Sequence, residues 1–254
     1  MLSRITRLVS LSVSNDSLSA RATNFAHLLP ACMRAVLAWY LADEPDGGHV
    51  PPALFTAKYA KIKELDPHHP VSMVFCSGGA KGYLSSLDMI MVDPYPVPNS
   101  PASQVVAALD AVVQLGKPVI MVPQSFGGGE GWARTPSAQE ERLMAYLGLV
   151  HGAVGWQYFI RSAPVSFPYA AAAWSEVRQV AAEIAELTPA VLSGVKPPSF
   201  TIAHPLQSRA WQDHNGTVYV RILSPPPPVL SRYTALASPS VFSLCVSVSR
   251  LTTD

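Results

Sequence analysis

Short, largely apolar runs alternate with stretches of helical periodicity along most of the chain. The apolar runs cover 35–41, 71–76, 89–92, 118–122 and 153–160. The helical stretches between and after them cover 52–65, 102–115, 135–150 and 174–187. Nearly continuous apolar runs are typical of parallel strands that helices bury on both faces. The pattern therefore predicts an α/β fold with a parallel sheet, which could be doubly wound or closed as a barrel.

The pattern changes after Gly194. Short strand-like stretches flank Asn215-Gly216, a dipeptide that favours a tight hairpin turn. Four consecutive prolines at 225–228 cannot continue a strand, and a serine-rich segment follows them. We therefore expect an α/β region at 35–194 to be followed by the start of a small β-domain at 195–223 and a Pro/Ser-rich disordered tail at 224–254.

The first residues, 1–34, are expected to form an N-terminal extension. They include Arg4, Arg7 and Arg21 and many serines, with no acidic residue before Asp16, which is the composition of a transit peptide. Two interpretations stay open, a targeting segment and a truncated or mispredicted start that has no targeting role.

The composition limits the partners to be expected. Hydrophobic residues make up 49% of the chain, charged residues 14%, and the formal net charge is +1, which fits a globular protein with a sizeable core. This near-neutral charge gives no reason to expect nucleic acid or an acidic membrane surface as partner. Cys32, Cys76 and Cys245 lack metal-ligand spacing, and no metal or organic cofactor is expected.

Polar and aromatic residues follow the predicted strands at their carboxyl ends. In parallel α/β folds the loops at these ends converge on one face, where functional residues gather. Carboxylates and amides bind sugar hydroxyls, and aromatic rings pack on the apolar faces of pyranose rings, so this set predicts a carbohydrate site. Its members are Asp43, Glu44, Ser77, Asp93, Tyr95, Gln124, Trp156, Gln157 and Tyr158.

A specific resemblance adds to this prediction. Segment 39–45, Trp-Tyr-Leu-Ala-Asp-Glu-Pro, resembles the fourth-strand motif of clan A glycoside hydrolases, in which a strand runs into Asn-Glu-Pro. Segment 93–96, Asp-Pro-Tyr-Pro, is similar to the residues that close strand six in related barrels. The resemblance covers about 35–194. It implies a partial (β/α)8 TIM barrel that holds strands four to eight, followed by a short β-rich C-terminal segment.

The resemblance also implies an activity, hydrolysis of O-glycosidic bonds in oligo- or polysaccharides. Glu44 would be the general acid/base, and Asp93 is the candidate for the second carboxylate. Carbohydrate is the expected partner, and the exposed edges of a partial sheet invite self-association. The residues expected to bind substrate are Asp43, Tyr95, Gln124, Glu130, Trp156 and Tyr158.

Departures from the family pattern keep an alternative open. Asp43 replaces the asparagine of the clan motif, and Gln124 stands near the place of the strand-seven nucleophile, where an amide cannot act as a carboxylate. Strands one to three are missing as well, since 1–34 is too short for three units of roughly thirty residues each. The alternative is a catalytically degenerate carbohydrate-binding barrel fragment. A doubly wound enzyme of another class is a third interpretation, but its usual glycine-rich or nucleophile-elbow motif is not found.

Overall fold

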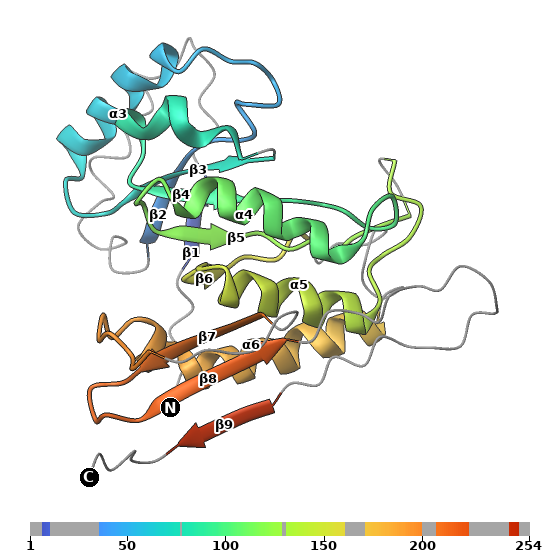
Figure 1. Ribbon diagram of the computed structural model, residues 1–254. Helices are drawn as coiled ribbons and strands as arrows, with labels where there is room; N and C mark the ends of the chain where they lie inside the picture. Colours follow the sequence, from blue (N-terminus) through green and yellow to red (C-terminus); the bar gives the residue numbers. More distant parts are fainter. Residues whose placement is uncertain are drawn as a thin grey trace. The chain divides into compact units, whose positions relative to one another are not determined.

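The computed structural model describes residues 7–10, 36–76, 78–128, 131–160, 171–199, 207–223 and 244–248. The chain divides into two compact units (Figure 1). The first comprises Met1–Asp93 and Ala111–Ile120, and the second comprises Pro94–Asp110 and Met121–Asp254. Among the described residues, no helix has the length and apolar character needed to cross a membrane.

Parallel strands in chain order form the framework of the first unit. They are β1 (Arg7–Ser10), β2 (Val36–Ala42), β3 (Val71–Phe75), β4 (Met89–Val92) and β5 (Val119–Met121), the last of which ends in the second unit. β1 to β4 pair in parallel, each with the next, and the Ile90 N–H donates to the Pro118 carbonyl beside β5 at 3.0 Å. A doubly wound sheet reverses its strand order at a switch point. This order has no reversal, so the α/β fold fits part of a barrel.

Helix α3 (Ala53–Leu65) and the 3-10 helix η2 (Gly79–Ser86) connect the strands of this unit. β3 is buried at every position, including its one polar residue, Ser72, whose hydroxyl donates to the Trp39 carbonyl at 3.0 Å. The ring of Tyr83 on η2 packs against Phe75 of β3 and Phe55 of α3, with ring centroids 5.3 Å and 5.9 Å away. The apolar side chains of strand and helices therefore meet in one core.

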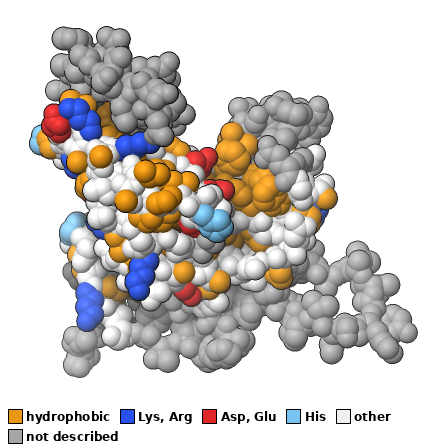
Figure 2. Space-filling view, turned by 90° about the horizontal axis from the view of Figure 1, so that it is seen from above, with side chains coloured by type: hydrophobic (Ala, Val, Ile, Leu, Met, Phe, Trp, Pro, Cys, Tyr) orange, Lys and Arg blue, Asp and Glu red, His pale blue; other side chains and the backbone are white. Residues whose placement is uncertain are grey.

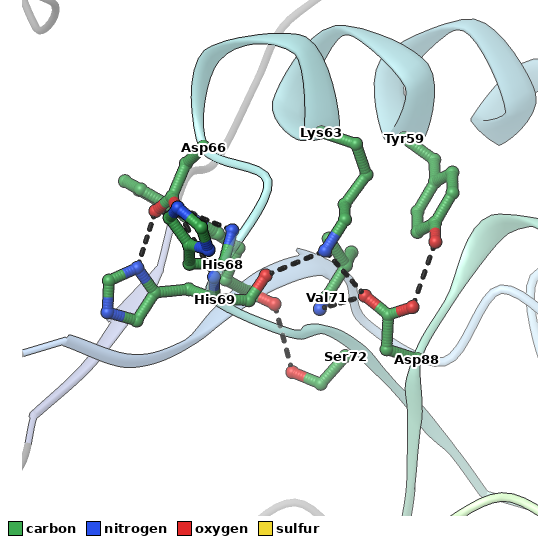
Figure 3. A network of polar contacts seen from close by, with 9 residues as sticks. Tyr59, Lys63, Asp66, His68, His69, Val71, Ser72 and Asp88 are labelled. Carbon is green, nitrogen blue, oxygen red and sulfur yellow. Dashed lines mark hydrogen bonds and ion pairs between the residues drawn. The ribbon is translucent and has the colours of Figure 1, made fainter.

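A polar network fixes the amino ends of β3 and β4 (Figure 3). The buried Asp66 carboxylate accepts hydrogen bonds from the Trp39 indole N–H at 2.9 Å and from the His69 ring at 2.6 Å. Asp88 accepts from the Val71 N–H at 2.9 Å and from the Tyr59 hydroxyl at 2.8 Å. Polar side chains at the amino ends of barrel strands usually serve stability, whereas those at the carboxyl ends serve function.

The second unit is built around two helices. α5 (Ala138–Val150) begins at a capping box, in which the Ser137 hydroxyl accepts from the Glu140 N–H at 3.3 Å and the Glu140 carboxylate accepts from the Ser137 N–H at 2.8 Å. α6 (Ala171–Val191) packs on α5 (Figure 1). Arg142 of α5 joins the two helices by ion pairs with carboxylates of α6. The capping box places the start of α5 slightly later than the Thr-Pro pair at 135–136 predicts.

The remaining elements are short. The 3-10 helix η3 (Ala102–Gln104) leads into α4 (Val105–Val113), and β6 (Gly155–Trp156) follows β5 in the sheet order. The expected strand at 153–160 is thus regular over two residues, although the Gln157 N–H still donates to the Met121 carbonyl of β5 at 3.0 Å.

A separate antiparallel sheet is formed by β7 (Gln207–Gln212), β8 (Val218–Leu223) and β9 (Leu244–Val248). The Asn215-Gly216 turn joins β7 to β8, and the Asp213 carboxylate accepts from the Asn215 and Thr217 N–H groups at 2.9 Å each.

Two strands lie in segments for which the sequence indicated no regular structure. β1 belongs to 1–34, the expected extension, and β9 belongs to 224–254, the expected disordered tail. Four or five residues with mixed polar and apolar character give little local signal for a strand. β1 is defined by its pairing with β2, and β9 by its pairing with β8, which the local sequence does not indicate.

Candidate functional site

Carboxylates gather at the carboxyl ends of parallel strands in the first unit. Glu44 follows β2 and Asp93 follows β4, while Cys76 follows the strand between them. Burial and nearby negative charges raise the pKa of the Cys76 thiol to about 11. The charges responsible are those of Asp46, Glu44 and Asp93. The loops after β2, β3 and β4 therefore converge, as the parallel topology requires, and we call Asp43, Glu44, Asp46 and Asp93 the carboxylate cluster.

Tyr40 links the strand itself to this cluster. Its hydroxyl donates to Asp43 Oδ1 at 2.7 Å, which fixes the direction of an otherwise exposed carboxylate. Burial is the main cause that raises the pKa of Tyr40, followed by the hydrogen bond to Asp43 and by the charges of Asp43, Asp93 and Glu44. Glu44 and Asp93 contribute to both the Tyr40 and the Cys76 shifts, so their carboxylates face a shared environment.

Glu44 occupies an uncommon backbone conformation. Its φ is 39°, in the left-handed region that a non-glycine residue adopts at a cost of roughly 1–3 kcal/mol. Hydrogen bonds within the loop maintain this conformation: the Gly48 N–H donates to the Glu44 carbonyl at 3.1 Å, and the Val50 N–H donates to the Pro45 carbonyl at 2.8 Å. The side chain is partly buried.

Asp93 is more deeply placed. Asp93 is 5% exposed, and its backbone N–H donates to the Phe75 carbonyl of β3 at 3.3 Å. The two expected catalytic carboxylates thus differ in environment, one on a strained, partly exposed loop and the other buried at a strand end.

Gln124 lies in the second unit with no exposed surface. Its side-chain amide hydrogen-bonds to the backbone of Val97 and Phe126. Both polar atoms of the side chain are therefore engaged in holding two loops together, and in this arrangement the buried amide offers nothing to a substrate.

Trp156 and Tyr158 face helix α5. The Trp156 indole N–H donates to the Ala145 carbonyl of α5 at 3.2 Å. The pKa of Tyr158 is raised by burial and then by the charge of Glu141, which also belongs to α5. On an extended segment, side chains two residues apart point to the same face, and neighbouring side chains point to opposite faces. Trp156 and Tyr158 therefore share one face, and Phe159 points to the other.

Phe159 lies on that other face and belongs to an aromatic cluster made by Tyr95, Phe126, Trp132 and Phe159. Tyr95 stacks on Phe159 with ring centroids 6.0 Å apart and meets Phe126 edge-on at 5.0 Å. The Trp132 indole N–H donates to the Tyr95 carbonyl at 3.0 Å. Phe159 remains 39% exposed, so one ring of the cluster is accessible from solvent.

Several members of these clusters were not predicted from the sequence. Asp46 had a signal, because Asp-Gly-Gly after a strand end favours a tight loop. The alternation of side chains along a strand could have indicated Phe159 instead of Trp156. The sequence of so short a strand, however, does not show which of its residues face which side of the sheet. Glu130 lies outside the described residues. Within the described ranges, no three His, Cys, Asp or Glu side chains are grouped to hold a metal ion.

One face of the molecule carries few charged side chains among the described residues. On the face shown in Figure 2, charged side chains lie singly or in small groups, and hydrophobic side chains gather in patches. This agrees with the 14% of charged residues in the sequence.

Comparisons with known proteins give similarity at the level of structure alone. No protein-family model matches the chain, and no curated protein matches it. A GH2 β-galacturonidase from Eisenbergiella tayi bound to galacturonate matches with a TM-score of 0.47 and 16% identity, over 66% of this chain and 37% of that chain. The same kind of enzyme from that organism, bound to glycerol, gives a TM-score of 0.38 and 19% identity over 54% and 29% of the two chains.

A candidate α-L-fucosidase from Bacteroides thetaiotaomicron gives a TM-score of 0.43 and 10% identity, over 58% of this chain and 57% of that chain. All three structures carry glycosidase names. The chain spans less than two thirds of the length of each of them.

Proposed function

We propose that this chain is a carbohydrate-active domain that hydrolyses O-glycosidic bonds, with Glu44 as the general acid/base. The observation that carries the proposal is the convergence of Glu44 and Asp93 on the surroundings of Tyr40 and Cys76. Glycoside hydrolysis uses two carboxyl groups, one that protonates the leaving oxygen and one that acts as nucleophile or base. The carboxylate cluster supplies both kinds of group from different strands.

The environments of the two residues suit different roles. Glu44 sits on a partly exposed loop, where it can exchange protons with solvent between catalytic cycles. Asp93 is buried, and a carboxylate in a surrounding of low dielectric acts strongly on the positive charge that develops on the sugar ring in the transition state. We therefore assign the acid/base role to Glu44 and the second carboxylate to Asp93.

The aromatic cluster supports the carbohydrate part of the proposal independently. The apolar face of a pyranose ring packs on an accessible aromatic ring, and Phe159 is the most exposed large aromatic side chain of this cluster. In this proposal Tyr95 and Phe126 hold the Phe159 ring in place through the contacts that they make with it.

A second candidate function is carbohydrate binding without hydrolysis. The observation in its favour is the buried, fully bonded amide of Gln124 at the position where the family resemblance leads us to expect a nucleophile. If Asp93 does not replace that nucleophile, the carboxylate cluster would bind hydroxyls and the chain would act as a degenerate barrel fragment.

The test is the hydrolysis of a panel of aryl glycosides and natural oligosaccharides by the wild-type chain, Glu44→Gln and Asp93→Asn. Glutamine keeps the shape of glutamate but cannot deliver a proton, so turnover by Glu44→Gln should fall roughly 10²–10⁴-fold on substrates with poor leaving groups. The loss should be smaller on activated aryl glycosides, which need little protonation. Glu186→Gln, an exposed residue of α6, is the control and should keep full activity.

The outcomes separate the candidates. Hydrolysis that depends on Glu44 in this way supports the enzyme. Calorimetric binding of an oligosaccharide without hydrolysis supports the binding module. The proposal fails if wild type neither hydrolyses nor binds any member of the panel, or if Glu44→Gln hydrolyses natural glycans as fast as wild type.

A further inference from the structure

We propose that Asp46 is a positioning residue for Glu44, because its carboxylate fastens the loop that carries Glu44 to the loop that follows β3. This inference rests on the proposed role of Glu44. Asp46 Oδ1 accepts from the Cys76 N–H at 3.3 Å and lies 3.7 Å from the thiol, and its Oδ2 accepts from the Gly79 N–H at 3.2 Å. One side chain therefore satisfies two backbone donors on the neighbouring loop.

Glycines allow the two loops to approach this closely. A Cβ atom at Gly79 would lie 2.7 Å from the Cβ of Asp46, and a Cβ atom at Gly47 would lie 2.9 Å from the Cys76 sulfur. Distances under 3.0 Å are shorter than real Cβ contacts, so a larger residue at either position would push the loops apart. The contact between Asp46 and the loop after β3 thus depends on residues from both sides.

A second anchor holds the far end of the same loop. The buried Tyr83 hydroxyl of η2 lies 2.6 Å from the Val50 carbonyl and 3.2 Å from the Pro45 carbonyl, and donates its proton between them. Tyr83 fixes Pro45, the residue after Glu44, and Val50 at the end of the loop, while Asp46 fixes the part between them. Glu44 lies between the end of β2 and these anchored residues, so its backbone has little freedom to move.

The anchors explain how Glu44 keeps its left-handed backbone. A strained conformation persists only where its surroundings determine it more strongly than the local preference of the residue. Without the Asp46 contacts, the turn closed by the Gly48 N–H and the Glu44 carbonyl would be free to relax, and the Glu44 side chain would change direction. The function of Asp46 is therefore to aim Glu44, without contact to the substrate.

The first test needs no substrate. Hydrogen exchange of the Gly48 and Val50 amides, measured by NMR on the full chain, should speed up about tenfold or more in Asp46→Ala, because the loop opens more often. Asp46→Asn keeps one acceptor oxygen and should give an intermediate rate. Gly79→Ala displaces the Asp46 side chain without changing its charge and should act like Asp46→Ala. Asp110→Asn, which removes a carboxylate of the second unit that pairs with His151, is the control.

Alkylation of Cys76 by iodoacetamide, followed by peptide mass spectrometry, checks that the Asp46 contact has been broken. Asp46 contributes to the raised pKa of the thiol, so its removal should make Cys76 react faster near pH 8.5. Each unit by which the pKa falls increases the thiolate fraction about tenfold at that pH. Faster alkylation with unchanged exchange of Gly48 and Val50 would overturn the proposal, because the contact would be lost while the loop stayed in place.

Kinetics then test the link to Glu44. On a substrate that wild type hydrolyses, Asp46→Asn should lower kcat with little change in KM, most strongly for poor leaving groups, and should cause no further loss in a Glu44→Gln background. Equal losses on good and poor leaving groups would contradict the aiming of Glu44. If no glycoside is hydrolysed, the proposed function fails, while the exchange measurement still decides whether Asp46 holds the loop.

Discussion

The side chain of Gln124 pairs with the backbone of Val97 as one strand pairs with another. Its Oε1 accepts from the Val97 N–H at 3.0 Å, and its Nε2 donates to the Val97 carbonyl at 2.7 Å. Both residues are fully buried. The segment after β4, which carries Tyr95, is therefore held by a side chain that follows β5, and the bonds give Gln124 a structural role that its position in the sequence did not suggest.

We predict that Gln124→Ala destabilises the chain by about 3–5 kcal/mol, since the backbone N–H and carbonyl of Val97 would be left buried without partners. Gln124→Glu has nearly the same shape but cannot donate to Val97 or Phe126 and adds a buried charge. It should therefore destabilise as much, and it should not create a nucleophile. Urea denaturation followed by circular dichroism measures both effects. A Gln124→Glu variant that is as stable as wild type and hydrolyses glycosides faster would refute this account.

The buried Glu141 predicts an unusual dependence of stability on pH. Glu141 of α5 is fully buried, and neither of its carboxylate oxygens has a well-formed hydrogen bond among the described residues, although Ser125 lies near enough to oppose the rise of its pKa. Burial dominates and raises the pKa from 4.5 to about 8. The unfolded chain releases this proton near pH 4.5, whereas the folded chain keeps it until about pH 8, so stability falls as pH rises through that window.

For this reason we expect Glu141→Gln to be more stable than wild type above pH 4.5, with a difference that grows by at most about 1.4 kcal/mol per pH unit up to about pH 8. Urea midpoints at pH 4, 6 and 8 measure the difference. The exposed Glu186→Gln should show none of this pH dependence. A constant difference between Glu141→Gln and wild type at all three pH values would mean that Glu141 is ionised in the folded chain.

The network around Asp66 predicts a loss of stability in acid. Burial alone would raise the pKa of Asp66, but hydrogen bonds from Trp39 and His69 outweigh it and hold the pKa below 3.8. A carboxyl group with a lowered pKa stabilises the fold above its unfolded pKa, and this contribution is lost as pH falls through the lower, folded value.

Asp66→Asn should therefore cost about 2–4 kcal/mol at pH 7, because an amide cannot accept all four hydrogen bonds that the carboxylate accepts. The variant should also lose less stability than wild type between pH 4 and pH 2. The melting temperatures of wild type and Asp66→Asn, measured across this range, provide the test. If both fall equally between pH 4 and pH 2, the Asp66 network does not cause the loss of stability in acid.

The sequence predicted the parts of the fold that local patterns determine. The apolar runs located β2 to β5, and Asn215-Gly216 located the β7–β8 turn. β1 and β9 were not predicted, since pairing with strands distant in the sequence defines them. The length of β6 was overestimated for a related reason: apolar residues from 153 to 160 contact α5 and the aromatic cluster, and only part of the segment pairs as a strand.

The candidate site was predictable to a similar extent. Topology and motif placed Glu44 and Asp93 at strand ends, where the structure has them. The direction of side chains was harder to predict. Trp156 and Tyr158 face α5, and Gln124 is closed off by backbone partners, because each of these side chains is oriented by contacts with segments more than ten residues away. The contacts of Asp46 with Gly79 and of Tyr83 with Val50 also join residues far apart in the sequence, so no local motif predicts them.

The left-handed backbone at Glu44 makes this position sensitive to the kind of selection applied in directed evolution. Glycine adopts positive φ without the steric cost that glutamate bears there, so Glu44→Gly is a substitution that enrichment for heat resistance alone would favour. A library enriched for turnover would retain glutamate if the side chain carries the chemistry. If one library is enriched in parallel under the two regimes, the codon frequencies at position 44 would therefore show whether glutamate is retained for activity at a cost to stability.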